Sequence, residues 1–354
     1  MIRFLLPLFL TLTALAQPLP DEQGAVEFQF RAPAARQVLL HGQWQKEPLE
    51  LSKDDKGLWS LRVEKLPAGV WEYSFSVDGL NVIDPMNPAL KPQRSPSKNI
   101  LHIPSSPPVA WDWQDVAHGT VHLHQYESNA VGTRRELVVY TPPGYESGDD
   151  TFPLLILQHG SGDNQRAWVE HGKAHWILDN LIAEGKAVPM VVMMLDGHPL
   201  GVVSREDVAK RMEAFGVFEK ELFTEALPLV EKLYRVDKEA ERRGLAGLSM
   251  GGSQALHIGL TNSDKLGWIG AFSTAPSSVE TAQQLVEDAD KLNANLKLLW
   301  IACGKDDFLI ERHNQFLKLL TEKNVKHTGL LTEGDHSWPV WRRYLGDFLP
   351  LLFR

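Results

Sequence analysis

A single serine, Ser249, stands between glycines in the stretch 244–252, which reads GLAGLSMGG. The pattern G-x-S-x-G holds a serine hydroxyl on a tight turn, where it becomes a nucleophile if a base removes its proton. So short a pattern also occurs by chance, and its meaning depends on the flanking residues. Residues 245–248 are apolar and typical of a strand, and residues 250–260 are typical of a helix. This order of strand, turn and helix is the setting that such a nucleophile requires.

A serine nucleophile needs a histidine base, and the histidine needs a carboxylate that fixes its tautomer. In folds built around this turn, the acid and then the base follow the serine along the chain. The stretch 304–308 presents two carboxylates after an apolar run, and the stretch 333–338 presents His336 after another. We therefore predict Asp307 as the acid and His336 as the base, with Asp306 as the alternative acid.

An ester carbonyl under attack develops negative charge, which two backbone N–H groups can stabilise in an oxyanion hole. Met250 is predicted to supply the first group because it directly follows the serine. The apolar run 154–158 leads into the sequence HGSG, so Ser161 is predicted as the second donor. His159 in the same loop is a further base candidate, but its early position favours a role in shaping the loop.

Other residues are candidates for contacts with a ligand. We expect His198 and Trp338, which lie in later loops, to contact the substrate. Three further histidines lie close together in the sequence: His118, His122 and His124. No carboxylate or cysteine completes a metal-ligand spacing around them, so an exposed strand face explains them better. Neither a metal nor an organic cofactor is expected.

The pattern of apolar and polar residues changes at the proline-rich stretch 104–108, which reads PSSPP. Residues 25–103 alternate between apolar and polar side chains, with turn residues between the runs, which predicts a small antiparallel β-sandwich. After residue 115, apolar strands alternate with amphipathic helices, which predicts an α/β fold with a mostly parallel sheet and helices on both faces. We therefore predict a sandwich module over 17–104, a linker over 105–114 and a catalytic domain over 115–354.

Within the predicted catalytic domain the periodicity predicts seven strands and six helices. The strands are expected at 137–140, 154–158, 190–195, 244–248, 268–272, 296–302 and 328–331. The helices are expected at 175–184, 204–233, 250–260, 280–292, 311–323 and 339–352. Pro228 lies inside the second helix and should kink or divide it, because proline lacks a backbone donor.

The net charge and residues 1–16 indicate which classes of partner and which cellular location to expect. The chain carries a net charge of -9 and no basic cluster, so nucleic acid and anionic membrane are poor partners. Residues 4–15 are apolar apart from two threonines, and Ala14, Leu15 and Ala16 match a signal peptidase site. We expect a signal peptide over 1–16, no membrane anchor after cleavage, and a secreted or periplasmic protein. The apolar run is shorter than the roughly 20 residues that span a bilayer.

Five blocks of the second region together resemble one family: TPPGY at 141–145, HGSGD at 159–163, GLSMGG at 247–252, GKDDF at 304–308 and GDHSW at 334–338. They resemble the esterase-D-like α/β-hydrolases, and within these carbohydrate esterase family one, the feruloyl and acetylxylan esterases. Enterochelin esterases and mycolyltransferases are related to that family. The resemblance covers about residues 115–354 and places the catalytic roles on Ser249, Asp307 and His336.

The resemblance implies hydrolysis of a carboxylic ester through an acyl-enzyme. The substrate would be an acylated carbohydrate or another small ester, with feruloyl or acetyl groups on plant polysaccharide such as xylan as the main hypothesis. Two alternatives stay open, namely a siderophore esterase or acyltransferase, and a carbohydrate-binding protein on an inactive hydrolase scaffold.

The first region resembles the early-set, glycogen-binding-like modules, a variety of immunoglobulin-like sandwich, on the sequence VDGLNVIDP at 77–85. Such a module can bind sugar or serve only as a structural cap. Four of its aromatic side chains could stack on sugars: Trp44, Trp59, Trp71 and Tyr73. Their regular alternation favours a packed core instead.

Overall fold

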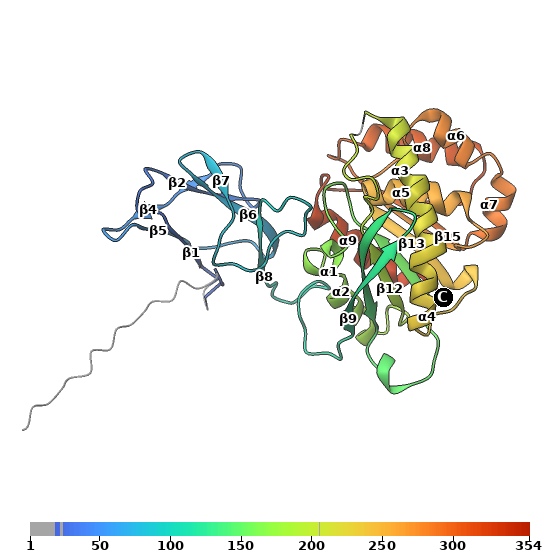
Figure 1. The fold of residues 1–354 in the computed structure, drawn as a ribbon, viewed down its shortest axis with the longest axis horizontal. Helices are drawn as coiled ribbons and strands as arrows, with labels where there is room; N and C mark the ends of the chain where they lie inside the picture. The colour runs from blue at the N-terminus through green and yellow to red at the C-terminus, as the bar shows by residue number, and fades with distance from the viewer. Residues whose placement is uncertain (1–17, 22–23, 205) are drawn as a thin grey trace, which may run out of the picture. The chain divides into compact units, whose positions relative to one another are not determined.

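The computed structural model of the protein describes residues 18–354 except 22, 23 and 205 (Figure 1). The predicted signal peptide over 1–16 lies outside the described residues. The chain divides into two compact units: the first runs to Lys91 and includes Ser97–Ile103, and the second comprises Pro92–Pro96 and Pro104–Arg354. Within the part that is described, no helix combines the length and apolar character needed to cross a membrane.

The first unit is built from two antiparallel sheets, as the alternation of its sequence predicts. One sheet has the order β1-β5-β4, and the other has the order β3-β2-β6-β7 with β8 paired to β6. Their bounds are β1 Val26–Arg31, β2 Val38–Gly42, β3 Leu49–Glu50, β4 Ser52–Lys53, β5 Leu58–Val63, β6 Gly69–Val77, β7 Leu80–Val82 and β8 Asn99–Ile103. Alternate side chains of both sheets share one apolar core, in which Trp59 and Tyr73 are buried and Trp44 and Trp71 are partly buried.

The second unit contains an eight-stranded sheet in the order β16-β15-β14-β13-β11-β12-β10-β9. The bounds are β9 Thr120–Ser128, β10 Thr133–Thr141, β11 Leu154–Gln158, β12 Val191–Leu195, β13 Arg243–Leu248, β14 Trp268–Phe272, β15 Leu298–Gly304 and β16 Thr328–Thr332. The pairs from β12 to β16 are parallel, whereas β10 is antiparallel to both β9 and β12. Every residue of β11, β12, β13 and β14 is buried, as expected for parallel strands covered on both faces.

Helices cover both faces of this sheet, as predicted (Figure 1). Alternate strand residues pack against α3 Val208–Glu221, α4 Leu227–Leu233, α5 Met250–Thr261, α6 Val279–Leu285, α7 Ala289–Asn295 and α8 Ile310–Glu322 on one face. The residues between them pack against α1 Ala167–Glu170, α2 Ala174–Ala183 and α9 Trp338–Phe348 on the other. Short helical turns are also present at Tyr145–Ser147, Leu222–Ala226, Ala240–Arg242 and Leu349–Leu351.

Two predicted helices are interrupted. The stretch 204–233 contains α3 and α4, and the π-helical turn Leu222–Ala226 lies between them, just before Pro228 in the first turn of α4. The stretch 280–292 contains α6 and α7 because Asp288 accepts the backbone N–H of Lys291 at 2.9 Å. This cap starts a new helix, since a capping aspartate satisfies a backbone donor that the first turn leaves free.

The predicted linker over 105–114 is not a free connection, which corrects the expected domain boundary. Asp112 is buried, and its carboxylate accepts the backbone N–H groups of Ser105 and Val109 at 3.0 and 2.9 Å. Asn180 of α2 donates to the carbonyl oxygens of Ala110 and Asp112. The segment therefore belongs to the second unit, together with Pro92–Pro96, which was predicted as part of the sandwich.

Candidate active site

Ser249 is the one residue between the end of β13 and the start of α5. Its backbone has φ 51° and ψ -113°, a region that L-residues avoid and that is held only where the surroundings enforce it. The turn leaves no space beside its glycines. A Cβ on Gly251 would lie 2.5 Å from the carbonyl oxygen of His159, and one on Gly247 would lie 2.6 Å from the carbonyl carbon of Gly251.

We expect Gly251→Ala to lower the free energy of unfolding by about 2 kcal/mol or more, because the new methyl group overlaps fixed backbone atoms. Gly216→Ala in α3 is the matched control, since a Cβ there meets no atom within 4 Å. The control should be stabilised by about 0.5–1 kcal/mol, the usual helical preference for alanine. Urea unfolding measures both, and equal stability of Gly251→Ala and the wild type would contradict the steric account.

Three side chains form a continuous chain of hydrogen bonds at the carboxyl ends of β13, β15 and β16. The distance from Ser249 Oγ to His336 Nε2 is 2.9 Å, and His336 Nδ1 lies 2.8 Å from Asp307 Oδ2. With the proton on Nδ1, the ring donates to the carboxylate and its free Nε2 accepts the serine proton. This geometry is that of a nucleophile, a base and an orienting acid.

The structure distinguishes the two carboxylates of the 304–308 loop. Asp307 is only 1% exposed, and its second oxygen accepts the backbone N–H of Leu309 at 2.9 Å. Burial raises the pKa of Asp307, but hydrogen bonds from His336 and Leu309 outweigh it and hold the pKa below its usual value. Asp306 is exposed, and its backbone N–H donates to the carbonyl oxygen of Gly334. The carboxylate that contacts His336 is therefore that of Asp307.

Ser249 lines a pocket whose empty space, counted together with the adjoining open solvent, is about 700 Å³. Three other predicted site residues line the same pocket: Ser161, His198 and Met250. Much of the remaining wall is apolar, from Val203, Ala214, Phe215, Ala275 and Leu309, and two guanidinium groups line it as well, from Arg211 and Arg312. The pocket-lining residues of α3 and α8 were not predicted, because no local sequence pattern marks them.

The loop after β11 is held by two histidines. His159 is buried, its Nδ1 donates to the carbonyl oxygen of Gly160 at 2.8 Å, and its Nε2 accepts the backbone N–H of Gly197 at 2.9 Å. His198 Nε2 accepts the backbone N–H of Gly162 at 2.9 Å, and burial lowers the pKa of His198 to about 4. Because both rings bind backbone groups, the two histidines shape the loops, and His198 also lines the pocket.

Trp338, which was predicted to contact the substrate, lies outside the pocket that Ser249 lines. It is 2% exposed and is absent from the wall of the pocket described above. Its ring packs against those of Trp168, His171 and Trp341. Trp338 lies in the first turn of α9, and its ring is buried in the apolar core between α9 and the sheet. This burial directs the ring away from the pocket.

The three clustered histidines each have a different partner. His118 Nδ1 lies 2.9 Å from Asp179, His122 Nε2 lies 3.0 Å from the hydroxyl of Thr141, and His124 Nε2 lies 2.5 Å from the hydroxyl of Tyr234. Across the described residues, no group of three His, Cys, Asp or Glu side chains converges as metal ligands would. Their contacts are those of a sheet edge packed against its neighbours.

Residues 128–352 match the model of the Esterase family, described as "Putative esterase". The chain is 28% identical over 349 residues to an endo-1,4-beta-xylanase/feruloyl esterase of Xylanibacter ruminicola, an alignment that covers 95% of this chain and 46% of that protein. The chain therefore spans about half the length of this relative.

Solved structures agree with the family match. A ferulic acid esterase is 27% identical with a TM-score of 0.59, and the match covers 66% of this chain and 97% of that one. An enterobactin esterase from Shigella flexneri is 19% identical with a TM-score of 0.64, and covers 94% of both chains, which shows a shared fold. The order of strands, the turn at Ser249 and the family match over residues 128–352 lead to one conclusion. The chain belongs to the Esterase family and has an α/β-hydrolase fold.

Proposed function

We propose that the protein hydrolyses carboxylic esters by a serine mechanism with Ser249 as nucleophile, His336 as base and Asp307 as orienting acid. The observation that carries this proposal is the hydrogen-bond chain from Ser249 through His336 to Asp307, at the wall of an open pocket. A buried carboxylate that stays ionised fixes the ring tautomer and stabilises the imidazolium that forms during the reaction.

In the first half of the reaction, Ser249 Oγ attacks the ester carbonyl carbon while His336 Nε2 takes the hydroxyl proton. The carbonyl oxygen becomes an oxyanion, and the backbone N–H groups of Ser161 and Met250 are the proposed donors to it. Each such donor contributes about 3 kcal/mol to the stability of the transition state. The tetrahedral intermediate then breaks its bond to the alkoxy oxygen, which leaves as the alcohol with the proton from His336.

In the second half, water attacks the acyl group on Ser249 while His336 takes a proton from that water. The new tetrahedral intermediate breaks its bond to Ser249 Oγ, which recovers a proton from His336, and the carboxylic acid leaves. Both halves use the same residues, so the overall reaction consumes one ester and one water and yields one acid and one alcohol.

The proposed substrate is a feruloyl or acetyl ester of a plant polysaccharide such as xylan. The names of the relatives support this class, since they include a feruloyl esterase and a ferulic acid esterase. The pocket also supports it, because Phe215, Val203 and Leu309 offer an apolar surface to an acyl group. A polymeric substrate of this kind lies outside the cell, in agreement with the secretion or periplasmic export expected from residues 1–16.

A second candidate is a siderophore ester of the enterochelin type. Among the described residues that line the pocket, Arg211 and Arg312 are cationic and none is a carboxylate. This charge favours anionic or catecholate groups. The fold shared with the enterobactin esterase is compatible with both candidates.

A kinetic panel decides between the candidates, with methyl ferulate, 4-nitrophenyl acetate, acetylated xylan and ferric enterobactin as substrates.

Phe215→Ala is expected to raise KM for methyl ferulate about tenfold and KM for 4-nitrophenyl acetate about twofold or less, because only the larger acyl group reaches the ring. The acetate ester serves as the internal control. Turnover of the siderophore alone would reject the polysaccharide substrate, and equal effects on both small esters would reject Phe215 as a contact of the aromatic group.

A further inference from the structure

The loop after β12 touches both sides of the proposed oxyanion hole. The backbone N–H of Gly197 donates to His159, and His198 accepts the N–H of Gly162, so this loop holds the segment that carries Ser161. On the other side, the side chain of Gln254 in α5 donates to the carbonyl oxygen of Gly197 at 2.8 Å. The two predicted donors come from separate elements, and this loop connects them.

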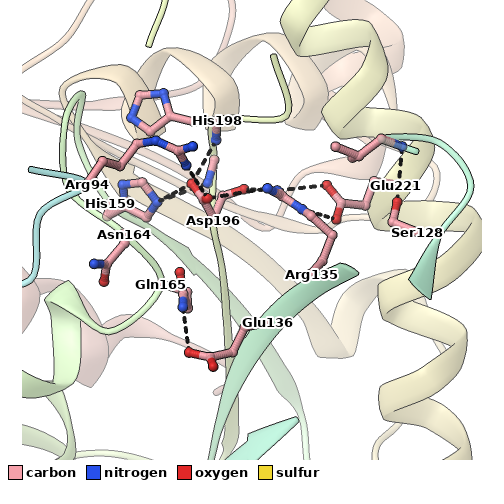
Figure 2. A network of polar contacts seen from close by, with 12 residues as sticks. Arg94, Ser128, Arg135, Glu136, His159, Asn164, Gln165, Asp196, His198 and Glu221 are labelled. Atoms are coloured by element: carbon pink, nitrogen blue, oxygen red, sulfur yellow. Dashed lines mark hydrogen bonds and ion pairs between the residues drawn. The ribbon is translucent and has the colours of Figure 1, made fainter. Parts of the chain in front are cut away.

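The first residue of that loop, Asp196, is held by two guanidinium groups (Figure 2). Its Oδ2 atom lies 2.6 Å from Arg94 Nη1 and 3.3 Å from Arg135 Nη1, and its Oδ1 atom accepts the backbone N–H of His198 at 3.1 Å. Arg135 also donates to the backbone carbonyl oxygen of Asp196 and pairs through Nε and Nη2 with the buried Glu221. The carboxylate is therefore satisfied on both oxygens.

Arg135 and Arg94 hold Asp196 in different ways. Arg135 comes from β10 and is itself fixed by Glu221, so it is part of the sheet. Arg94 comes from Pro92–Pro96, whose neighbours on both sides in the sequence belong to the first unit, whereas this segment belongs to the second. The side chain of Arg94 is 38% exposed and that of Asp196 is 13% exposed, so water screens this pair in part.

The same segment also pairs with the oxyanion loop through its backbone. The backbone N–H of Arg94 donates to the carbonyl oxygen of Gly162 at 2.9 Å, and that of Asn164 donates to the carbonyl oxygen of Pro92 at 3.2 Å. Gln93 forms an isolated antiparallel bridge with Asp163. The segment thus runs beside the loop that carries Ser161 and contacts Asp196 as well.

We propose that Arg94 is a positioning residue for the oxyanion hole, which it fixes through Asp196 and the loop Asp196 begins. The inference rests on the proposed function, because it assumes that Ser161 and Met250 stabilise the oxyanion. Arg94 holds Asp196 from outside the sheet, and Asp196 orders the loop that joins His159, His198 and Gln254. Loss of the guanidinium leaves Asp196 with one charged partner and loosens the donors without removing either of them.

The test is the steady-state kinetics of Arg94→Ala, Arg94→Lys, Asp196→Asn and Arg94→Ala/Asp196→Asn on 4-nitrophenyl acetate, with thermal unfolding of each variant. Arg94→Ala is expected to lower kcat about tenfold and to leave KM within about twofold. Displaced N–H donors stabilise the transition state less, while the binding of the ground-state ester changes little. Arg94→Lys should recover most of the loss. In the Asp196→Asn background, Arg94→Ala should have little further effect, because residues that act as a unit are not additive. Arg134→Ala, which removes an exposed neighbour on β10 paired with Glu127, is the control and should resemble wild type.

Three outcomes overturn the inference. They are unchanged kinetics of Arg94→Ala, a rise in KM with unchanged kcat, which would make Arg94 a substrate contact, and an equal loss of kcat in the Asp196→Asn background. If Arg94→Ala does not fold, Arg94→Gln carries the same comparison, because it also removes the charge but keeps part of the side chain. Failure of the proposed function is distinguishable, because wild type would then hydrolyse no faster than Ser249→Ala whatever stands at position 94.

Discussion

Replacement of Ser249 by alanine is expected to lower kcat roughly 10⁵- to 10⁶-fold on any ester that the wild type hydrolyses. The alanine side chain has no oxygen to attack the carbonyl, and His336 then has no proton to remove. KM should change little, because the pocket walls and the N–H groups of Ser161 and Met250 remain in place. The measurement is initial-rate kinetics on 4-nitrophenyl acetate with protein checked by circular dichroism.

The control is Ser147→Ala, which removes an exposed hydroxyl in the turn Tyr145–Ser147. The Ser147 hydroxyl donates to the carbonyl oxygen of Gly144 beside the same turn. It should keep the activity of the wild type within about twofold, as surface substitutions usually do. Residual turnover of Ser249→Ala above one part in a thousand would show that another group attacks the ester.

Asp307→Asn is expected to lower kcat about 10⁴-fold, whereas Asp306→Asn should stay within about twofold of wild type. An asparagine amide at 307 can donate to His336 Nδ1, which would place the ring proton on Nε2. That nitrogen could then no longer accept the proton of Ser249. The buried carboxylate of Asp307, with its pKa held below the usual value, is ionised at neutral pH and prevents this tautomer.

The two aspartates form a matched pair, because they are adjacent and undergo the same chemical change. Kinetics of both variants at neutral pH on one ester give the comparison. Equal losses would mean that the loop as a whole is fragile, and a larger loss in Asp306→Asn would reassign the acid.

The residues of the site could be predicted because the fold fixes their order. Ser249, Asp307 and His336 follow β13, β15 and β16, and the carboxyl ends of parallel strands meet at one edge of a sheet. The strands were recognisable since buried parallel strands are continuous apolar runs, and β11 and β14 have the predicted bounds. The glycines around Ser249 could also be interpreted from the sequence, because so tight a turn has no space for a side chain at Gly247 or Gly251.

Other features depend on tertiary contacts that have no local pattern. Trp338 was expected in the pocket, but its place in the first turn of α9 directs it into the core. The pocket walls from α3 and α8 are set by helix packing, and periodicity gives the buried face of a helix without naming its neighbours. Pro92–Pro96 was predicted as part of the sandwich because the residues on both sides of it in the sequence belong to the sandwich. Its backbone hydrogen bonds to residues 162–164 place it in the second unit.

The role of Ser249 as the nucleophile is tested by intact-protein mass spectrometry of the enzyme quenched during turnover of 4-nitrophenyl acetate. We expect one added acetyl group per chain when deacylation is the slower step, located by peptide mapping on Ser249 and missing in Ser249→Ala. Undiminished hydrolysis by Ser249→Ala, or an acetyl group on another residue that turns over and persists in Ser249→Ala, would contradict this role of Ser249.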